Sequence, residues 1–287
     1  MYGLICNDEI SLVSHCLFLN FRQALYNIFD KENFKDVRSS NDLDSITHLF
    51  IIDEHFGPNV NVWKDINFIN IINDKKIKTF VFNFEPIYNS PYRNDAINHQ
   101  KFLEQINNLT QFLSDVDDFE NLKRGPFLNR QYLSKDTYVK VINPNLEKIK
   151  DKILFIGQAG GHAYSRRQET LKQVSDILSM EIIVTERKLT YDQFLETLSK
   201  YQYVLNPLGI GYFLNLRYYE ILKLENTPIQ QVTPKMLELI TDLKNDYSIN
   251  FINPEELRGI DFSNFKQNRT PLYLEDYLKD NKLLELL

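Results

Sequence analysis

The chain has 287 residues, of which 33 are basic and 39 acidic, so its formal net charge is −6, and 43% of its residues are hydrophobic. This composition is typical of a globular protein and excludes a disordered, a collagen-like and a disulfide-rich chain. The length predicts about two domains, each large enough to bury a core.

Short apolar runs alternate with amphipathic stretches in the first half of the chain. Tyr2–Cys6, Leu49–Ile52 and Thr79–Phe84 have the length and the β-branched or aromatic content of strands. Residues Cys16–Phe29 place apolar side chains at helical spacing. Strands that alternate with helices predict a mostly parallel sheet, whose ligands bind beyond the carboxyl ends of the strands.

An Asn-Pro turn at Asn143-Pro144 and the charged segment Glu147–Lys152 precede a second half with the same alternation. The elements expected there are a strand at Ile153–Gly157, a helix around Leu171–Leu178, a strand at Glu181–Val184, a helix around Phe194–Leu198, a strand at Tyr203–Leu205, a helix from Phe213 to Glu225, a strand at Pro228–Val232 and a helix opened by Pro234. The sequence therefore predicts an α/β protein with two Rossmann-like lobes, residues 1–145 and 146–271, an interlobe cleft and a closing helix in 272–287.

Charges and cysteines limit the location and the partners. The sequence has no basic arm and no acidic tail, so bulk electrostatic capture of nucleic acid or of an anionic membrane is not expected. The two cysteines, Cys6 and Cys16, lack metal-binding spacing, which indicates free thiols in a reducing compartment. With no secretory signal pattern and no long apolar run, we expect a cytoplasmic protein without a membrane span.

The stretch Asn206–Glu220 runs from an expected strand through Gly209 and Gly211 into an expected helix. Glycines at such a junction let backbone N–H groups approach a ligand, and the helix N-terminus favours an anion. Arg217, about one turn into the expected helix, would bind phosphate oxygens, and Glu220 would accept from ribose hydroxyls. The alternative is a surface ion pair between Arg217 and Glu220.

The stretch Phe155–Arg167 has the same order of features: a strand, then glycines, then arginines at the start of a helix. Backbone donors followed by guanidinium groups suit a diphosphate. The alternative is a solvated loop with two exposed arginines, although cations in a first turn oppose the helix dipole unless an anion compensates. The glycines are Gly157, Gly160 and Gly161, and the arginines are Arg166 and Arg167.

Together with the short strand that opens with Pro228-Ile229, these two stretches resemble the donor lobe of GT-B glycosyltransferases over residues 152–232. In the first half, Val81–Pro86 resembles the strand-end Glu-Pro of fucosyltransferase-type enzymes. The resemblance implies a GT-B fold and a nucleotide-sugar co-substrate of the UDP or GDP type. It implies no metal requirement, because arginines and a helix dipole can neutralise the leaving diphosphate.

The resemblance also implies which residues contact the donor. Glycines and arginines would hold the diphosphate, and Glu220 would hold the ribose. Glu186 would lie near the nucleobase, and Tyr191 would be available to stack on it. The implied donor residues are Gly157, Gly160, Gly161, Arg167, Glu186, Tyr191, Gly209, Gly211, Arg217 and Glu220.

An inverting transfer needs a general base for the acceptor hydroxyl. Glu85, Asp53 and Asp8 each follow an expected strand, and we favour Glu85 because Pro86 fixes the turn. For each of them an ordinary loop or helix-cap carboxylate is the alternative. Two histidines at similar positions, His55 and His162, are further candidates.

A competing pattern is Asp-x-Asp, with which GT-A glycosyltransferases bind a divalent metal and a diphosphate. It occurs at Asp115–Asp117 and at Asp42–Asp44, but in a chain with 39 acidic residues such triplets arise by chance, so we expect ordinary loops there.

The expected function is transfer of a hexosyl or pentosyl group from a nucleotide sugar to an acceptor hydroxyl. The acceptor is a surface glycan, or a hydroxymethylated DNA base modified by a phage enzyme in the host cytoplasm. The net charge of −6 counts against DNA, because phosphate contacts need a basic face. The alternative is a non-catalytic, two-domain nucleotide- or sugar-binding protein. The sequence does not predict the oligomeric state.

Overall fold

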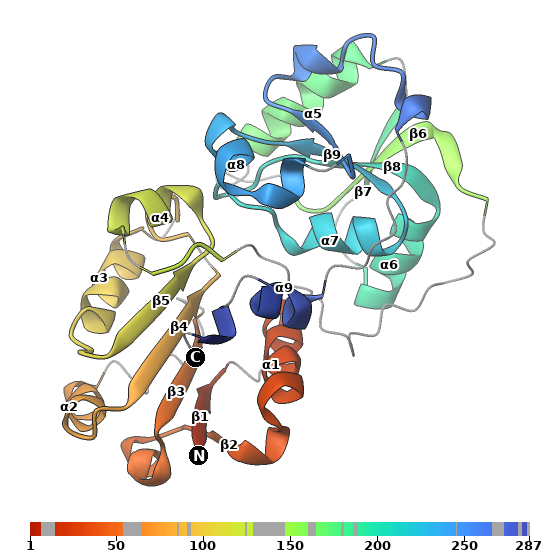
Figure 1. Cartoon of the computed structure of the whole chain (residues 1–287). Helices are drawn as coiled ribbons and strands as arrows, with labels where there is room; N and C mark the ends of the chain where they lie inside the picture. The colour runs from red at the N-terminus through yellow and green to blue at the C-terminus, as the bar shows by residue number, and fades with distance from the viewer. Residues whose placement is uncertain are drawn as a thin grey trace. The chain divides into compact units, whose positions relative to one another are not determined.

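The chain divides into two compact units, unit 1 with Met1–Thr137 and Leu272–Leu287, and unit 2 with Tyr138–Pro271 (Figure 1). The computed structural model describes residues 1–6, 15–53, 65–84, 86–90, 93–123, 125–128, 147–159, 165–178, 181–185, 189–244, 246–265, 273–280 and 283–285. The expected cleft concerns the placement of one unit on the other and stays a prediction.

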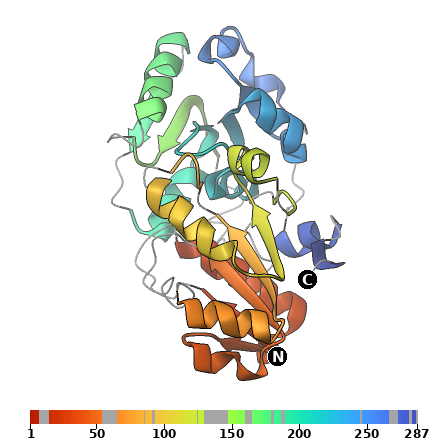
Figure 2. The same ribbon diagram turned by 90° about the vertical axis from the view of Figure 1, so that its left-hand side faces the viewer.

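Unit 1 is a parallel sheet with helices on both faces. Its elements are β1 (Tyr2–Ile5), α1 (His15–Phe29), β2 (Phe34–Asp36), β3 (His48–Asp53), α2 (Ile66–Asp74), β4 (Lys78–Asn83), α3 (Arg93–Leu103), β5 (Leu109–Leu113), α4 (Val116–Leu122) and α9 (Leu274–Asp280). The strand order is β2-β1-β3-β4-β5, and every pairing is parallel. Helices α1 and α9 cover one face, and α2, α3 and α4 cover the other (Figure 1), which Figure 2 shows from the side of α2 and α3.

Alternating side chains of the unit 1 strands build a core on each face of the sheet. Ile51 and Val81 pack in one core cluster with residues of α2. On the opposite face Phe82 stacks on Phe112 at a centroid distance of 4.6 Å and contacts Phe21 of α1 at 4.5 Å. Because both faces are covered, the strands read as continuous apolar runs in the sequence.

The C-terminal segment packs on unit 1. Helix α9 contacts α1, where Asn27 Nδ2 donates to Glu275 Oε1 at 3.0 Å. Leu274 and Leu278 of α9 are fully buried. The helix covers only part of the expected range 272–287 and is followed by a 3-10 turn at Leu283–Glu285.

Unit 2 is also a parallel sheet with helices on both faces. Its elements are β6 (Ile149–Ile156), α5 (Ser165–Ile177), β7 (Glu181–Thr185), α6 (Tyr191–Ser199), β8 (Tyr201–Asn206), α7 (Leu216–Lys223), β9 (Thr227–Gln231), α8 (Pro234–Leu239) and β10 (Ile249–Phe251). The strand order is β10-β9-β8-β6-β7 with parallel pairings. Apolar residues of α5 pack on one face, and those of α6 and α7 on the other. Two Rossmann-like α/β units with parallel sheets are thus confirmed.

The two sheets share one strand order. Numbered from the first strand of each unit, both read 2-1-3-4-5. In unit 2 the neighbours β6 and β8 lead to α5 and α7, which lie on opposite faces of the sheet. The carboxyl ends of two such strands are the position at which doubly wound sheets bind their ligands.

Two expected boundaries in unit 2 are wrong. Strand β6 starts at Ile149 instead of Ile153, because Ile149 pairs with Tyr201 of β8. This end of the strand is exposed, so it accommodates the charged residues that follow Ile149. Helix α7 starts at Leu216 instead of Phe213, because the Asn215 side chain accepts the Tyr218 N–H and caps the helix there. Arg217 therefore lies in the first turn.

Lys148, directly before β6, binds the chain that follows the last turn of α7. Its ammonium donates to the carbonyl oxygens of Leu224 at 2.6 Å and Glu225 at 2.7 Å, and to Oδ1 of Asn226. We expect Lys148→Met to lower the free energy of unfolding by about 2 kcal/mol, because three oxygens lose a charged donor. Urea denaturation measures this, with the exposed Lys150→Met as the control. Equal midpoints for the two variants would contradict the role of Lys148.

Candidate anion-binding site

The loops that follow β6 and β8 meet at the carboxyl ends of these neighbouring strands in unit 2. Arg166, in the first turn of α5, donates from Nη2 to the carbonyl oxygens of Gly209 at 2.8 Å and Ile210 at 3.3 Å. Its guanidinium also lies 4.7 Å from the ring centroid of Tyr212. Arg166 thereby fixes the loop after β8 to the helix after β6.

Two glycines make room for two arginines across these loops. A Cβ on Gly157, after β6, would lie 2.7 Å and 2.9 Å from the Nη atoms of Arg217 on α7. A Cβ on Gly209, after β8, would lie 2.7 Å from Nη2 of Arg167 on α5. Each guanidinium thus occupies the space that a side chain would fill if the glycine facing it were a larger residue. We call this arrangement the crossed arginine pair.

Both guanidinium groups of the crossed arginine pair are held by their surroundings. Arg167 is 7% exposed, and its Nη1 donates to the carbonyl oxygen of Gln158 at 2.7 Å. Arg217 lies 6.0 Å from the ring centroid of Phe155 and 5.8 Å from that of Phe194. Two fixed cations next to the N-termini of α5 and α7 make this edge of the sheet electropositive.

The burial of two side chains bears on the structural alternatives for these arginines. Arg167 is buried, so it does not belong to a solvated loop. Glu220, about one turn after Arg217 on α7, is 2% exposed and thus lies below the surface.

The other implied donor residues lie partly outside the described part of the chain. Gly211 is buried in the loop after β8, and Glu220 is buried on α7. Gly160, Gly161, Glu186 and the side chain of Tyr191 lie outside the described residues. Their roles stay predictions.

Of the base candidates, His162 belongs to unit 2, and the others belong to unit 1. Asp53 ends β3 and pairs in register with Asn83 of β4, and its side chain is outside the described part. Four further candidates, Glu85, Asp8, His55 and His162, are also outside it.

Two polar side chains, Asp118 and Ser114, bind the backbone on the two sides of Glu85. Asp118 of α4 accepts the backbone N–H groups of Ile87 at 2.7 Å and Tyr88 at 2.9 Å. Ser114 donates to the Asn83 carbonyl oxygen at 2.8 Å. Sequence patterns did not predict this role of Asp118, because its partners are about 30 residues earlier in the chain.

The first Asp-x-Asp triplet has structural partners. Asp115 Oδ1 accepts the N–H groups of Asp117 at 3.0 Å and Asp118 at 3.2 Å, which caps α4. Asp117 Oδ2 accepts from Asn89 Nδ2 at 2.8 Å. These contacts agree with the expectation of an ordinary loop.

The second triplet has partners of the same kind. Asp42 accepts the N–H groups of Arg38 and Ser39, and these contacts, with Lys35, lower its pKa to about 2. Asp44 pairs with Lys75 at 2.7 Å. Within the described ranges, no group of three or more His, Cys, Asp or Glu side chains is arranged to hold a metal.

Asp118 gives unit 1 an unusual pH dependence. Burial raises its pKa to about 7, and the Asp115 carboxylate adds to this, although two N–H donors oppose it. The folded state therefore binds a proton more tightly than the unfolded chain between about pH 4 and pH 7, and this stabilisation is lost as the pH rises through that window. Relative to Asp118→Asn, the wild-type free energy of unfolding should fall by on the order of 3 kcal/mol from pH 4 to pH 8. Urea denaturation of both proteins tests this, and parallel pH profiles would contradict it.

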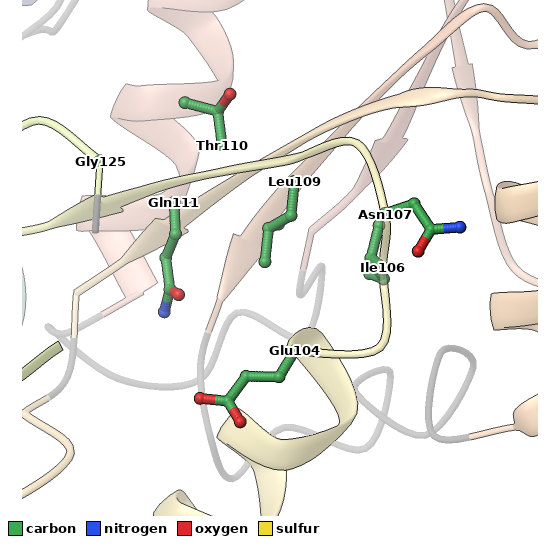
Figure 3. Close-up of a pocket in the computed structure, with 7 residues that line it drawn as sticks. All are labelled: Glu104, Ile106, Asn107, Leu109, Thr110, Gln111 and Gly125. Carbon is green, nitrogen blue, oxygen red and sulfur yellow. The ribbon is translucent and has the colours of Figure 1, made fainter. Parts of the chain in front are cut away.

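A separate cavity of about 550 Å³ lies beside β5 in unit 1. Figure 3 shows Leu109 and Gln111 pointing to the side of β5 on which Glu104 lies, whereas Thr110 points to the other side. The described residues that line it include one carboxylate and no cation: Glu104, Ile106, Asn107, Leu109, Thr110, Gln111 and Gly125. Its lining does not suit an anion.

Sequence reasoning missed several amide side chains below the loop after β8. Asn206 and Gln231 are the last residues of β8 and β9 and are buried. A polar residue at the last position of a buried strand is the signal that could have found them.

None of the helices in the described ranges is long and apolar enough to span a bilayer.

Comparison with known proteins gives likenesses among solved structures only. No family model and no curated protein matches the chain. One similar structure is the glycotransferase of kitacinnamycin, at 10% identity and a TM-score of 0.37, with 86% of this chain and 70% of that chain covered. Another is Arabidopsis thaliana UGT89C1 complexed with UDP, at 12% identity and a TM-score of 0.33, with coverage of 96% and 79%. Both of these structures are glycosyltransferases.

Proposed function

We propose that unit 2 binds the diphosphate of a nucleotide sugar and that the chain is a glycosyltransferase. The observation that carries this proposal is the crossed arginine pair, Arg167 beside Gly209 and Arg217 beside Gly157, at the ligand-binding edge of a doubly wound sheet. Fixed cations and helix N-termini are the groups that bind phosphates in proteins.

The same groups suit the chemistry of sugar transfer. When the bond between the anomeric carbon and the diphosphate oxygen breaks, its electron pair stays on that oxygen, and the negative charge there grows. Cations already in place stabilise this charge more in the transition state than in the ground state. They can do so without a metal ion. In this proposal Glu220 binds the ribose, the glycines after β6 and β8 donate backbone N–H groups, and Glu186 with Tyr191 lies at the base.

In an inverting reaction the acceptor oxygen forms the new bond to the anomeric carbon and loses its proton to a base. We assign the role of this base to Glu85, and Asp53 is the second candidate. The acceptor is a surface glycan hydroxyl or a hydroxymethylated DNA base. Turnover on duplex DNA should fall steeply with added salt, because phosphate contacts release counterions, whereas turnover on a neutral glycan should not.

Calorimetric titration tests the donor site. We expect binding of pyrophosphate and of at least one nucleoside diphosphate from a panel of UDP, GDP, ADP and CDP, in buffer with EDTA. A folded protein that binds none of them would overturn the proposal. Binding followed by no hydrolysis or transfer of any nucleotide sugar would favour the non-catalytic binding protein instead.

Replacing Glu85 with glutamine tests the base. We expect the transfer rate to fall by on the order of a hundredfold or more, because the amide cannot take the proton, while donor affinity stays unchanged. Steady-state kinetics and calorimetry measure the two quantities, and Glu120→Gln, an exposed carboxyl of α4, is the control. Full activity of Glu85→Gln would exclude Glu85 as the base.

A further inference from the structure

Amide side chains hold both ends of the loop between β8 and α7. Asn206, the last residue of β8, donates from Nδ2 to Oδ1 of Asn215 at 3.0 Å, and Asn215 Nδ2 lies 3.2 Å from Oδ1 of Asn206. Asn206 Nδ2 also contacts Oε1 of Gln230 at 2.7 Å. Because Asn215 caps α7, the amide pair fixes the loop and the first turn that carries Arg217 together.

Gln231, the last residue of β9, connects this loop to α5. Its Oε1 accepts the backbone N–H of Leu208 at 3.0 Å. The same oxygen lies 3.2 Å from the Thr170 hydroxyl, which is also 3.0 Å from the carbonyl oxygen of Arg166. One side-chain oxygen thus joins the loop that contains Gly209 to the helix that contains Arg167.

This contact lies in a buried environment. Gln231 is 9% exposed, Thr170 4% and Leu208 4%. A buried N–H that loses its acceptor is unfavourable, so the loop would shift to recover a partner. Such a shift would change the distance between Gly209 and Arg167 without touching either residue.

We propose that Gln231 is a positioning residue for diphosphate binding, which it serves by keeping the loop after β8 in register with α5. This inference rests on the proposed function. An anion that contacts both arginines needs the loop after β8 and helix α5 in one arrangement. If only a fraction of the molecules has this arrangement, the affinity for the anion falls in proportion to that fraction. An anion that contacts one arginine does not have this requirement.

Calorimetry of Gln231→Met with two anions tests the proposal. Methionine has a similar length and lacks the acceptor oxygen. We expect pyrophosphate to bind about tenfold more weakly and orthophosphate to bind within about twofold of wild type, so that the preference for pyrophosphate falls. With a nucleotide sugar that turns over, the donor KM should rise by about the same factor at an unchanged kcat.

Two further variants complete the experiment. Thr170→Val removes the hydroxyl that faces Gln231 and keeps the shape of the side chain. It should change the two affinities in the same direction as Gln231→Met, with a smaller effect. This variant keeps the proposal testable if Gln231→Met does not fold. Gln173→Met, an exposed glutamine of α5, should bind both anions like wild type.

The outcomes separate this inference from the proposed function. Wild-type protein that binds neither pyrophosphate nor a nucleoside diphosphate contradicts the proposed function. Wild-type binding with equal loss of both anions in Gln231→Met, or with no loss of either, overturns the positioning role and leaves the donor site in place.

Discussion

Replacing Arg217 with methionine should weaken the binding of pyrophosphate and of nucleoside diphosphates about thirtyfold, which corresponds to about 2 kcal/mol. The loss comes from charged hydrogen bonds to phosphate oxygens, which are stronger than neutral ones. Methionine loses the cation–π contact with the rings of Phe155 and Phe194 but fills similar space beside them, so the free energy of unfolding should change less than the affinity.

The matched control is Arg258→Met. Arg258 is an exposed arginine of unit 2 that pairs with Glu255 at 2.9 Å. The control removes the same charge from the same unit, so it accounts for any effect of net charge on anion binding. Arg217→Lys should fall between wild type and Arg217→Met, because an ammonium lacks the planar fork of donors. Equal affinities of wild type and Arg217→Met would make Arg217 a structural residue only.

Gly157→Ala should reduce diphosphate affinity at least as much as Arg217→Met and should also destabilise unit 2. Gly157 has a φ of 148°, a region that costs other residues about 1–3 kcal/mol. The added Cβ would lie within 3 Å of both Nη atoms of Arg217, so the guanidinium must move. Calorimetry and urea denaturation measure the two effects.

Two other glycines separate these effects. Gly259 has a φ of 75° with no atom within 4 Å of an added Cβ, so Gly259→Ala should cost stability and leave affinity unchanged. Gly209 has no positive φ, but an added Cβ would lie 2.7 Å from Arg167 Nη2, so Gly209→Ala should mainly lower affinity. If Gly157→Ala acts through Arg217, its effect on affinity should nearly vanish in the Arg217→Met background. Additive effects would contradict the crossed arginine pair.

The fold was largely predictable because both sheets are covered on both faces. Buried parallel strands give continuous apolar runs, so β3, β4 and β8 stand out in the sequence. β2 and β10 have three residues each and give no such run. The start of α7 depends on the Asn215 cap, which competes with the apolar pattern from Phe213 onward.

The glycine-containing loops after β6 and β8 were predictable as sequence motifs, but their contacts were not. Glycines followed by arginines indicate an anion site within one loop. That Gly157 accommodates Arg217, about 60 residues later, follows only from the adjacency of β6 and β8 in the sheet. The contact of Gln231 with Leu208 likewise depends on β9 lying next to β8.

The most direct test of the donor site is a crystal structure of the protein with the nucleoside diphosphate that binds best in the titrations. The account predicts that both phosphates contact the Arg167 and Arg217 guanidinium groups and the backbone N–H groups after β6 and β8. A diphosphate bound elsewhere, with these arginines away from it, would contradict the account.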